Sequence, residues 1–358
     1  MKQLIIYHSN VQKYGGIETL NAILLKALAP FFDITFMYDF CSPNQLEEYS
    51  KYVKCKPLGN QRHKADVVIS QSLWGRNCWD NIETNCRIQV IHADLLCYAL
   101  MGIFRAELDK RITDYVCVSE QSQKSFKELH KKESTVIYNL VKQPVIFTRF
   151  KNPILKLISV TRMSSEKGIQ RCIDFAKLIP VPYSWEIYGE GGVYNAAGTN
   201  IKFMGYGTNL QPKIAEADYL VQLSETEGYC YSVVEALQQR TPVLITPFPS
   251  GLEQVTEGQN GYFIPFDLKG IDFYKIINHI PKPQTYKSKS DVKDWVKFIN
   301  LAVLNIKTMK IKIIGQNETF KIGEIVDISE ERAKSAIERG LAELVKKEKK
   351  ETIKLPKL

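Results

Sequence analysis

The chain has 358 residues, 44% of them hydrophobic and 24% charged, with a net charge of +9; this is ordinary for a soluble globular protein, and the length suits two domains. No apolar run approaches the roughly 20 residues that span a bilayer, and the apolar core of residues 1–10 is too short for a signal peptide. The eight cysteines lack a Cys-x-x-Cys pair or zinc-like spacing, which favours buried thiols in a reducing cytosol over disulfides or a metal site, so we expect a cytoplasmic protein.

The first half of the chain alternates strand-like and helical segments. Strand-like runs occupy residues 2–8, 34–37, 66–70, 87–92, 115–119 and 135–139. Helical patterns include residues 17–28, which Pro30 ends, and residues 95–112, where apolar side chains repeat every four positions. This alternation predicts a doubly wound parallel sheet, in which ligands bind at the carboxyl ends of the strands.

Two features of this half lie where strands end. Gly15 and Gly16 precede the first helix, where adjacent glycines let the backbone approach a ligand closely; a plain strand-to-helix turn is the alternative. His92 ends a strand and could hydrogen-bond a sugar hydroxyl or handle a proton near neutral pH, although a lone histidine is more often structural.

The second half repeats the alternation after a break near residues 147–153, where we expect a domain boundary. Strand-like runs follow at residues 156–160, 185–188, 219–223 and 242–246. Arg162 and Lys167 come directly after the first of these runs and before Gly168. This combination suits a diphosphate, because a guanidinium forks two oxygens and an ammonium adds a point charge.

Residues 224–240 form the stretch around which the chain is organised. A polar loop leads from a strand into a helix, whose first N–H groups and dipole favour an anion such as phosphate. Glu227 in the loop and Glu235 inside the helix stand eight positions apart. Carboxylates accept hydrogen bonds from vicinal hydroxyls of a sugar or a ribose. The stretch therefore predicts a nucleotide-sugar site, and a solvated helix face is the alternative.

Seven segments in order resemble the retaining glycosyltransferases of family 4, also called glycosyl transferases group 1. They are Tyr-Gly-Gly-Ile-Glu at 14–18, Thr-Arg-x4-Lys-Gly at 161–168, the glycine turn at 189–192, the loop at 200–207, Glu-x7-Glu at 227–235, Gly-Leu-Glu-Gln-Val at 251–255 and Asn-Gly at 260–261. The resemblance implies the GT-B fold, an α/β architecture of two Rossmann-like domains that face a cleft. It also implies a nucleotide-diphosphate sugar as donor, most often a uridine one.

The resemblance carries residue roles with it. Glu227 is expected to meet the donor sugar and Glu235 the ribose hydroxyls, while Arg162 and Lys167 neutralise the diphosphate and His92 lies near the sugar. The remaining donor-binding positions are Gly15, Gly16, Gly189, Tyr206, Gly207, Gly228, Tyr229, Cys230 and Tyr231. Two positions depart from the family. Cys230 replaces a glycine and is expected to place a side chain near the phosphate, and Arg240 replaces a glycine that commonly caps the helix.

The last part of the chain changes character after about residue 302. Strand-like runs at 310–314 and 319–326 precede a helix at 330–339 that Gly340 ends, and residues 346–358 form a basic tail that we expect to be disordered. This small ββα unit resembles modules of phage structural proteins, which indicates docking rather than catalysis and suggests a phage-encoded chain. We therefore expect domains at 1–150 (the acceptor domain), 151–303 (the nucleotide-sugar domain) and 304–358.

The sequence predicts a retaining glycosyltransferase that moves a hexosyl or N-acetylhexosaminyl group from a uridine-diphosphate sugar to a hydroxyl of a protein or glycan. No Asp-x-Asp motif is present, so we expect no metal and no cofactor. The alternative is a non-catalytic partner subunit that binds sugar nucleotides or glycoprotein; a phosphorylase or epimerase lacks a supporting acid pair. Residues 304–358 suggest a docking partner, peripheral membrane contact is a minority alternative, and no basic and aromatic stripe indicates nucleic acid.

Overall fold

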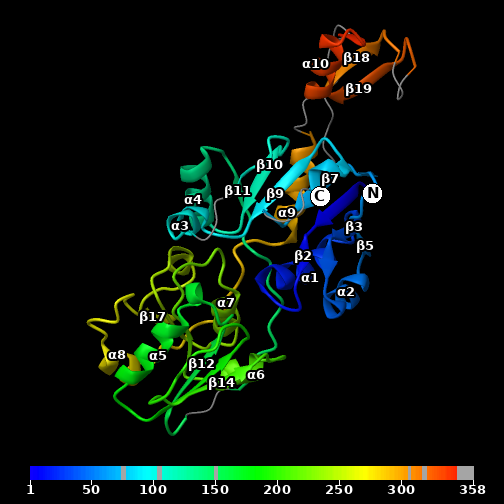
Figure 1. Cartoon of the computed structure of the whole chain (residues 1–358). Helices are drawn as coiled ribbons and strands as arrows, with labels where there is room; N and C mark the ends of the chain where they lie inside the picture. Colours follow the sequence, from blue (N-terminus) through cyan, green and yellow to red (C-terminus); the bar gives the residue numbers. More distant parts are fainter. Residues whose placement is uncertain (74–77, 103–106, 149–151, 305–307, 317–320, 345–358) are drawn as a thin grey trace. The chain divides into compact units, whose positions relative to one another are not determined.

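The computed structural model describes residues 1–73, 78–102, 107–148, 152–304, 308–316 and 321–344. The chain divides into two compact units, Met1–Lys297 and Phe298–Leu358. The first unit contains two parallel sheets, each with its own helices, which are called here the first lobe and the second lobe (Figure 1).

The first lobe, blue to cyan-green in Figure 1, is built on a parallel sheet of seven described strands in the order β11-β10-β9-β7-β1-β3-β5. Its strands are β1 (Gln3–Tyr7), β3 (Asp33–Tyr38), β5 (Lys54–Pro57), β7 (Val67–Ser70), β9 (Arg87–Ile91), β10 (Asp114–Cys117) and β11 (Thr135–Val136). The central strands are buried apolar runs, as expected for a parallel sheet covered on both faces. The predicted doubly wound arrangement is therefore present.

Helices and short strands complete this lobe. The helices are α1 (Gly16–Leu28), α2 (Pro43–Ser50), α3 (Leu95–Leu100), α4 (Glu120–His130) and the 3₁₀ turn η1 (Cys78–Asp80). The two-residue strands are β2 (Asn10–Val11), which pairs with β4 (Phe40–Cys41), and β6 (His63–Lys64), which pairs with β8 (Ile82–Glu83).

The helix expected at residues 95–112 is much shorter in the structure. Asp94 caps α3 by accepting a 3.0 Å hydrogen bond from the Cys97 N–H. The helix ends at Leu100, and Gly102 has a φ of +67°, a left-handed conformation that stops a helix. Residues 107–113 are not helical, and residues 103–106 of the expected helix lie outside the described residues. The prediction of one continuous helix was wrong.

The second lobe, green to yellow in Figure 1, contains a parallel sheet of six described strands in the order β14-β13-β12-β15-β16-β17. The strands are β12 (Leu155–Val160), β13 (Tyr183–Tyr188), β14 (Ile201–Gly205), β15 (Tyr219–Gln222), β16 (Val243–Ile245) and β17 (Gly261–Phe263). The helices are α5 (Ile169–Leu178), α6 (Gln211–Glu216), α7 (Tyr231–Gln238), α8 (Phe273–Asn278) and the 3₁₀ turns η2 (Ser165–Lys167) and η3 (Pro249–Glu253). Trp185 is fully buried in its core.

Two stretches of chain join the lobes. The outgoing segment, residues 140–147, is held by side chains of the α7 end, because Gln238 and Gln239 each donate a 2.8 Å hydrogen bond to its carbonyls. The returning segment, residues 279–291, contacts the first lobe again where Ser290 Oγ accepts a 3.0 Å hydrogen bond from the Tyr138 N–H. It leads into α9 (Val292–Leu304), whose Trp295 is fully buried. Within the described part of the chain, no helix has the length and apolarity that crossing a membrane requires.

The second unit contains β18 (Thr308–Ile313), β19 (Ile325–Ser329), α10 (Glu330–Glu338) and β20 (Ala342–Leu344). Its sheet order is β19-β18-β20, with both pairings antiparallel. The predicted ββα module is therefore corrected to ββαβ, and the second strand begins later than residue 319, because residues 321–324 form a turn. Residues 319–320 and the tail at 346–358 lie outside the described residues, as do 149–151 of the expected boundary. The division at 1–150, 151–303 and 304–358 stays a prediction.

Candidate functional site

The start of α7 is the centre of the candidate site. Strand β15 is fully buried and ends at Gln222, after which a loop at the carboxyl edge of the second sheet leads into the helix. The helix is preceded by Cys230, which makes no side-chain capping hydrogen bond. The first N–H groups of α7 therefore lack the side-chain acceptor that usually occupies a helix start.

Lys167 and Glu227, sixty residues apart in sequence, form a buried ion pair beside this helix start. The Lys167 Nζ lies 2.7 Å from Glu227 Oε2, and only 11% and 12% of the two side chains are exposed. Burial opposes the charge of Lys167, but the attraction of Glu227 outweighs it, so the pKa of Lys167 is raised. Ser224 Oγ also donates to Glu227 Oε1 over 2.9 Å. The carboxylate is thus fixed in orientation from two sides.

Backbone contacts explain how these two loops meet. The Glu225 N–H donates a 2.8 Å hydrogen bond to the Glu166 carbonyl. Gly168 has a φ of +68°, and a Cβ there would lie 1.9 Å from the carbonyl oxygen of Leu223, so only glycine fits. Strands β12 and β15 are neighbours in the sheet, which brings the loops that follow them to the same edge.

The Arg162 side chain is more exposed than that of Lys167 and is held less tightly. Its side chain is 61% exposed and its Nη2 lies 3.4 Å from Glu166 Oε1, a long contact. Such an exposed pair contributes little to stability, on the order of 0–1 kcal/mol. Ser164 Oγ, at 2.7 Å, holds the same Glu166 oxygen more closely. Arg162 can therefore exchange its partner for an anionic ligand at small cost.

The glycine pair of the first lobe lies beside α7. A Cβ at Gly16 would be 3.5 Å from Tyr231, in ordinary contact. A Cβ at Gly15 would be 2.2 Å from the carboxylate of Glu18, which the loop encloses and which accepts a 3.0 Å hydrogen bond from the Gln12 N–H. Burial raises the pKa of Glu18, and this rise is partly offset by backbone N–H donors and by Arg162 of the second lobe. Glu18 was not among the predicted site residues, although the Gly-Gly-x-Glu motif contains it.

His92 also contacts the loop between β15 and α7. A Cβ at Gly228 would lie 1.9 Å from the His92 carbonyl oxygen, so this close approach requires glycine. The His92 Nε2 lies 2.7 Å from Gln71 Oε1. Burial, and then the neighbouring His8, lower the pKa of His92 to about 3. The ring is therefore neutral near pH 7, which favours a hydrogen-bonding role over proton handling.

The loops after β13 and β14 carry the positions expected near the nucleobase. Gly189 has a φ of +150°, and a Cβ there would lie 1.8 Å from the Thr161 carbonyl oxygen. Gly207 packs against Tyr188 and Leu210, where a Cβ would be 2.8 Å from each. Tyr206 stacks on Tyr14 of the first lobe with ring centroids 4.2 Å apart.

The residues that begin α7 point in different directions. Tyr231 donates a 2.8 Å hydrogen bond to the Leu140 carbonyl, and the Tyr229 hydroxyl lies 3.4 Å from the hydroxyl of Tyr286. The Cys230 side chain packs in the hydrophobic core with Val233. The thiol also lies 3.3 Å from the Ser232 hydroxyl, and its place beside the phosphate stays a prediction.

Glu235 lies one turn into α7. Burial raises its pKa to about 7, although Lys142 lowers it in part. At the far end of the helix, Arg240 has a φ of +60° and occupies the left-handed position that a glycine commonly takes. The structure thus brings Lys167, Glu227, Gly228, His92 and Gly16 together around the start of α7.

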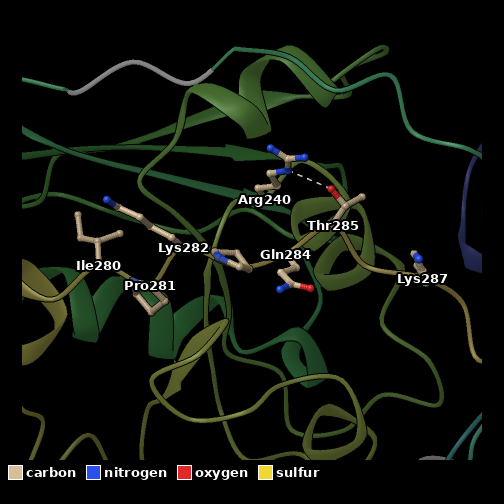
Figure 2. A pocket seen from close by; sticks show the side chains of 8 residues that line it. Arg240, Ile280, Pro281, Lys282, Gln284, Thr285 and Lys287 are labelled. Atoms are coloured by element: carbon tan, nitrogen blue, oxygen red, sulfur yellow. Dashed lines mark hydrogen bonds between the residues drawn. The ribbon is translucent and has the colours of Figure 1, made fainter.

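A metal cluster or a hollow can also mark a functional site. In the described residues no group of three or more His, Cys, Asp or Glu side chains could hold a metal ion. A hollow of about 810 Å³ lies instead beyond the other end of α7. Figure 2 shows that Arg240, Lys282 and Lys287 on its wall point in different directions, and Arg240 Nε donates to Thr285 Oγ1 over 3.0 Å. These cations do not converge on one ligand.

Comparisons with known proteins agree with the geometry. Residues 147–282 match the family model described as "Glycosyl transferases group 1". The viral protein ORF31 (isolate Australia/Victoria), which is named as a glycosyltransferase, is 27% identical over 129 residues. That match covers 33% of this chain and 40% of the relative's length.

Solved structures show the fold. The structure of Anabaena HepE with UDP and glucose aligns with a TM-score of 0.62 at 15% identity, covering 85% of this chain and 100% of that one. TarM aligns with a TM-score of 0.65 at 13% identity, covering 84% and 99%. The lipopolysaccharide galactosyltransferase WaaB gives 0.61 at 15% identity, covering 85% and 99%. The predicted GT-B fold is therefore confirmed.

Proposed function

We propose that this protein is a retaining glycosyltransferase that moves a hexosyl or N-acetylhexosaminyl group from a uridine-diphosphate sugar to a hydroxyl of a protein or glycan. The observation that carries the proposal is the buried Lys167–Glu227 pair at the uncapped start of α7, with the loosely held Arg162 on the neighbouring loop. The HepE structure is a complex with UDP and glucose, which supports uridine as the base of the donor.

Arg162, Lys167 and the first N–H groups of α7 would receive the diphosphate. Charge develops on the leaving diphosphate as the sugar departs, and fixed cations and dipoles stabilise it without reorganisation at that moment. Removing one such donor typically costs about 10²–10³ in kcat. These groups would serve in place of a metal ion.

Glu227 would accept hydrogen bonds from donor-sugar hydroxyls, and Glu235 would accept them from the ribose. Lys167 and Ser224 orient the first of these carboxylates. His92 would contact the sugar from the first lobe, because its backbone packs against Gly228. The two lobes together would then enclose the reacting carbon and exclude water.

The retained configuration would follow from attack on the face that the leaving group occupies. The acceptor oxygen forms a bond to the anomeric carbon while the bond from that carbon to the phosphate oxygen breaks. The hydroxyl proton passes to the departing diphosphate, so no enzyme nucleophile is needed. Each atom and charge is accounted for between acceptor, donor and product.

The donor is tested with a panel of UDP- and GDP-sugars, measured for thermal stabilisation and for slow hydrolysis. We expect UDP-sugars to raise the melting temperature and to be hydrolysed. Arg162→Ala should abolish turnover and leave the melting temperature of the free protein unchanged, since its ion pair is exposed. Lys156→Ala, which removes the cation at the other end of β12, is the matched control and should retain turnover.

Two outcomes would contradict the proposal. Near-normal kinetics of Arg162→Ala would remove the assigned role of the arginine. Stabilisation by UDP-sugars without turnover, with any acceptor supplied, would identify a binding partner rather than an enzyme.

Comparing the acceptor KM of the full chain with that of a chain ending at residue 303 tests whether residues 304–358 dock the acceptor.

A further inference from the structure

Three neighbouring strands of the first sheet are each followed directly by a residue with a polar side chain. The order β9-β7-β1 places His92, Gln71 and His8 side by side, since each is the first residue after its strand. Gln71 is 2% exposed and His8 is 6% exposed. This polar row lies on the same carboxyl edge that contacts Gly228 of the second lobe.

The contacts of the row define the protonation of its rings. His92 Nε2 and Gln71 Oε1 are 2.7 Å apart. An amide oxygen only accepts, so His92 Nε2 carries the proton and Nδ1 is left as an acceptor. The Asn21 amide Nδ2 likewise lies 3.2 Å from His8 Nδ1, which leaves the His8 proton on Nε2. Each ring is thus fixed by an amide that cannot ionise.

The surroundings keep both rings neutral. Burial lowers the pKa of His8 to about 4, and burial together with His8 lowers that of His92 to about 3. The loop that contacts His92 through Gly228 carries Glu225 and Glu227. Their charges are compensated by Arg171 and by Lys167 of η2, respectively. No hydrogen-bond partner of His92 Nδ1 is found in the described part of the chain.

We propose that Gln71 is a positioning residue for sugar transfer: it fixes the buried, neutral ring of His92 as the Nε2–H tautomer, so that Nδ1 accepts a hydrogen bond from a hydroxyl of the donor sugar. This inference rests on the proposed function, and it extends the site by a residue that contacts no reacting atom itself. The Gln71 Nε2 has no hydrogen-bond partner among the described residues, so within that part of the chain the contact with His92 is the side-chain hydrogen bond of this buried amide.

The tautomer can be measured without any substrate. The chain has five histidines, so long-range ¹H–¹⁵N spectra of the imidazoles are simple, and the His92→Asn variant identifies the His92 signals. We expect His92 as the neutral Nε2–H tautomer, unchanged between pH 5 and pH 8, in the full-length protein. A proton on Nδ1 would mean that the Gln71 amide is turned round, and it would overturn the proposal.

The kinetic test uses two substitutions at Gln71. Gln71→Glu keeps the shape but adds a carboxylate that favours the imidazolium, so the pKa of His92 should rise and Nδ1 should become a donor. The acid limb of the kcat–pH profile should then move to higher pH by about one unit or more. Gln71→Leu removes the acceptor and should lower kcat roughly tenfold, with no such movement of the profile.

The matched control is Gln89→Leu. Gln89 is equally buried, at 2% exposure, and its amide donates to the carbonyls of Ser70 and Val90 on the same sheet. The Gln89→Leu variant should have a lowered melting temperature, as Gln71→Leu should, but its kcat should stay within about twofold of the wild type. Equal kcat in the two leucine variants, or a Gln71→Glu profile that overlays the wild type, would reduce Gln71 to a structural role.

The failure of this inference can be told apart from failure of the proposed function. If no UDP- or GDP-sugar is turned over, the proposed function fails, while the spectra still decide whether Gln71 sets the tautomer of His92. If sugars are turned over but the profile of Gln71→Glu does not move, only the positioning role fails. Should Gln71→Leu not fold, the isosteric glutamate variant and the wild-type spectra still decide the question.

Discussion

The two halves of the candidate site use opposite electrostatics. In the second lobe the site contains a buried charged pair, Lys167 and Glu227, whose Nζ and Oε2 atoms are 2.7 Å apart. In the first lobe the row of His92, Gln71 and His8 is neutral, with both ring pKa values far below 7. Charge in a buried place is tolerated only with a partner, whereas a neutral ring needs only a hydrogen bond.

Under the proposed function, this difference would divide the work between the lobes. A diphosphate brings negative charge and needs cations, while sugar hydroxyls are neutral and need donors and acceptors of fixed orientation. Neutral rings in the first lobe also leave the charge of the second lobe undisturbed. The comparison can be tested by changing charge on one side and following both stability and turnover.

The largest effect is expected for Lys167→Met. It removes a proposed diphosphate cation and leaves Glu227 buried without its counter-charge, so turnover should fall by about 10³-fold or more and the free energy of unfolding by about 3 kcal/mol. Thermal melts and donor turnover measure the two effects.

A second substitution separates them. The double variant Lys167→Met/Glu227→Gln should recover much of the lost stability, because no unpaired charge remains, and should stay inactive. A double variant that regains turnover would show that the pair serves folding alone, and the contrast between the lobes would lose its functional meaning.

A smaller effect, with a distinct pH dependence, is expected for Glu235→Gln. The pKa of Glu235 is raised from 4.5 to about 7, so between these values the folded state holds a proton that the unfolded state has lost. Stability should therefore fall as pH rises from about 4.5 to 7, by at most about 3 kcal/mol. Glu235→Gln should flatten that part of the stability profile.

Nucleotide binding should also depend on the protonation of Glu235, but here the ionised carboxylate should be the favoured form. Ribose hydroxyls donate to the ionised carboxylate, so UDP binding should release a proton below pH 7 and should tighten as pH rises from about 6 to 8. Calorimetry in two buffers of different ionisation enthalpy measures the proton release. If the wild type and Glu235→Gln release equal amounts, Glu235 does not meet the nucleotide.

The sequence predicted much of the architecture, because buried parallel strands such as β1 and β12 are short apolar runs between turns. It failed where a pattern continued through a break: the four-residue repeat after Leu95 continues past Gly102, whose left-handed backbone ends α3. It also missed β20, since three residues carry too little signal for a strand. These errors are local, and neither touches the carboxyl edges of the two large sheets.

The site was predictable only as far as motifs extend. The family resemblance placed Lys167 and Glu227 on one ligand, but their direct ion pair depends on β12 lying beside β15, which spacing along the chain does not show. Gln71 was missed for the same reason. A glutamine after a strand carries no signal until the order β9-β7-β1 places it against His92.

The smallest effect on turnover is expected for a substitution of Glu253, a carboxylate of the second lobe that contacts the start of a helix in the first lobe. Glu253 of η3 accepts hydrogen bonds from the N–H groups of Glu120, at 3.1 Å, and Gln121, at 2.8 Å, which begin α4 of the first lobe. It also accepts one of 2.8 Å from the Tyr138 hydroxyl, and burial together with this carboxylate raises the pKa of Tyr138. A negative charge at a helix start contributes about 0.3–1 kcal/mol.

Glu253→Gln keeps the shape of this contact and removes its charge, so the lobes should separate more often. Amide hydrogen exchange at Glu120 and Gln121 should accelerate by about twofold to fivefold, the factor that roughly 0.3–1 kcal/mol corresponds to, and kcat/KM should fall by no more than that. Glu257→Gln, which removes an exposed charge of the same lobe paired with Lys275 at 3.8 Å, is the control and should change neither. Unchanged exchange in Glu253→Gln would mean that the charge of Glu253 does not help to hold the lobes together.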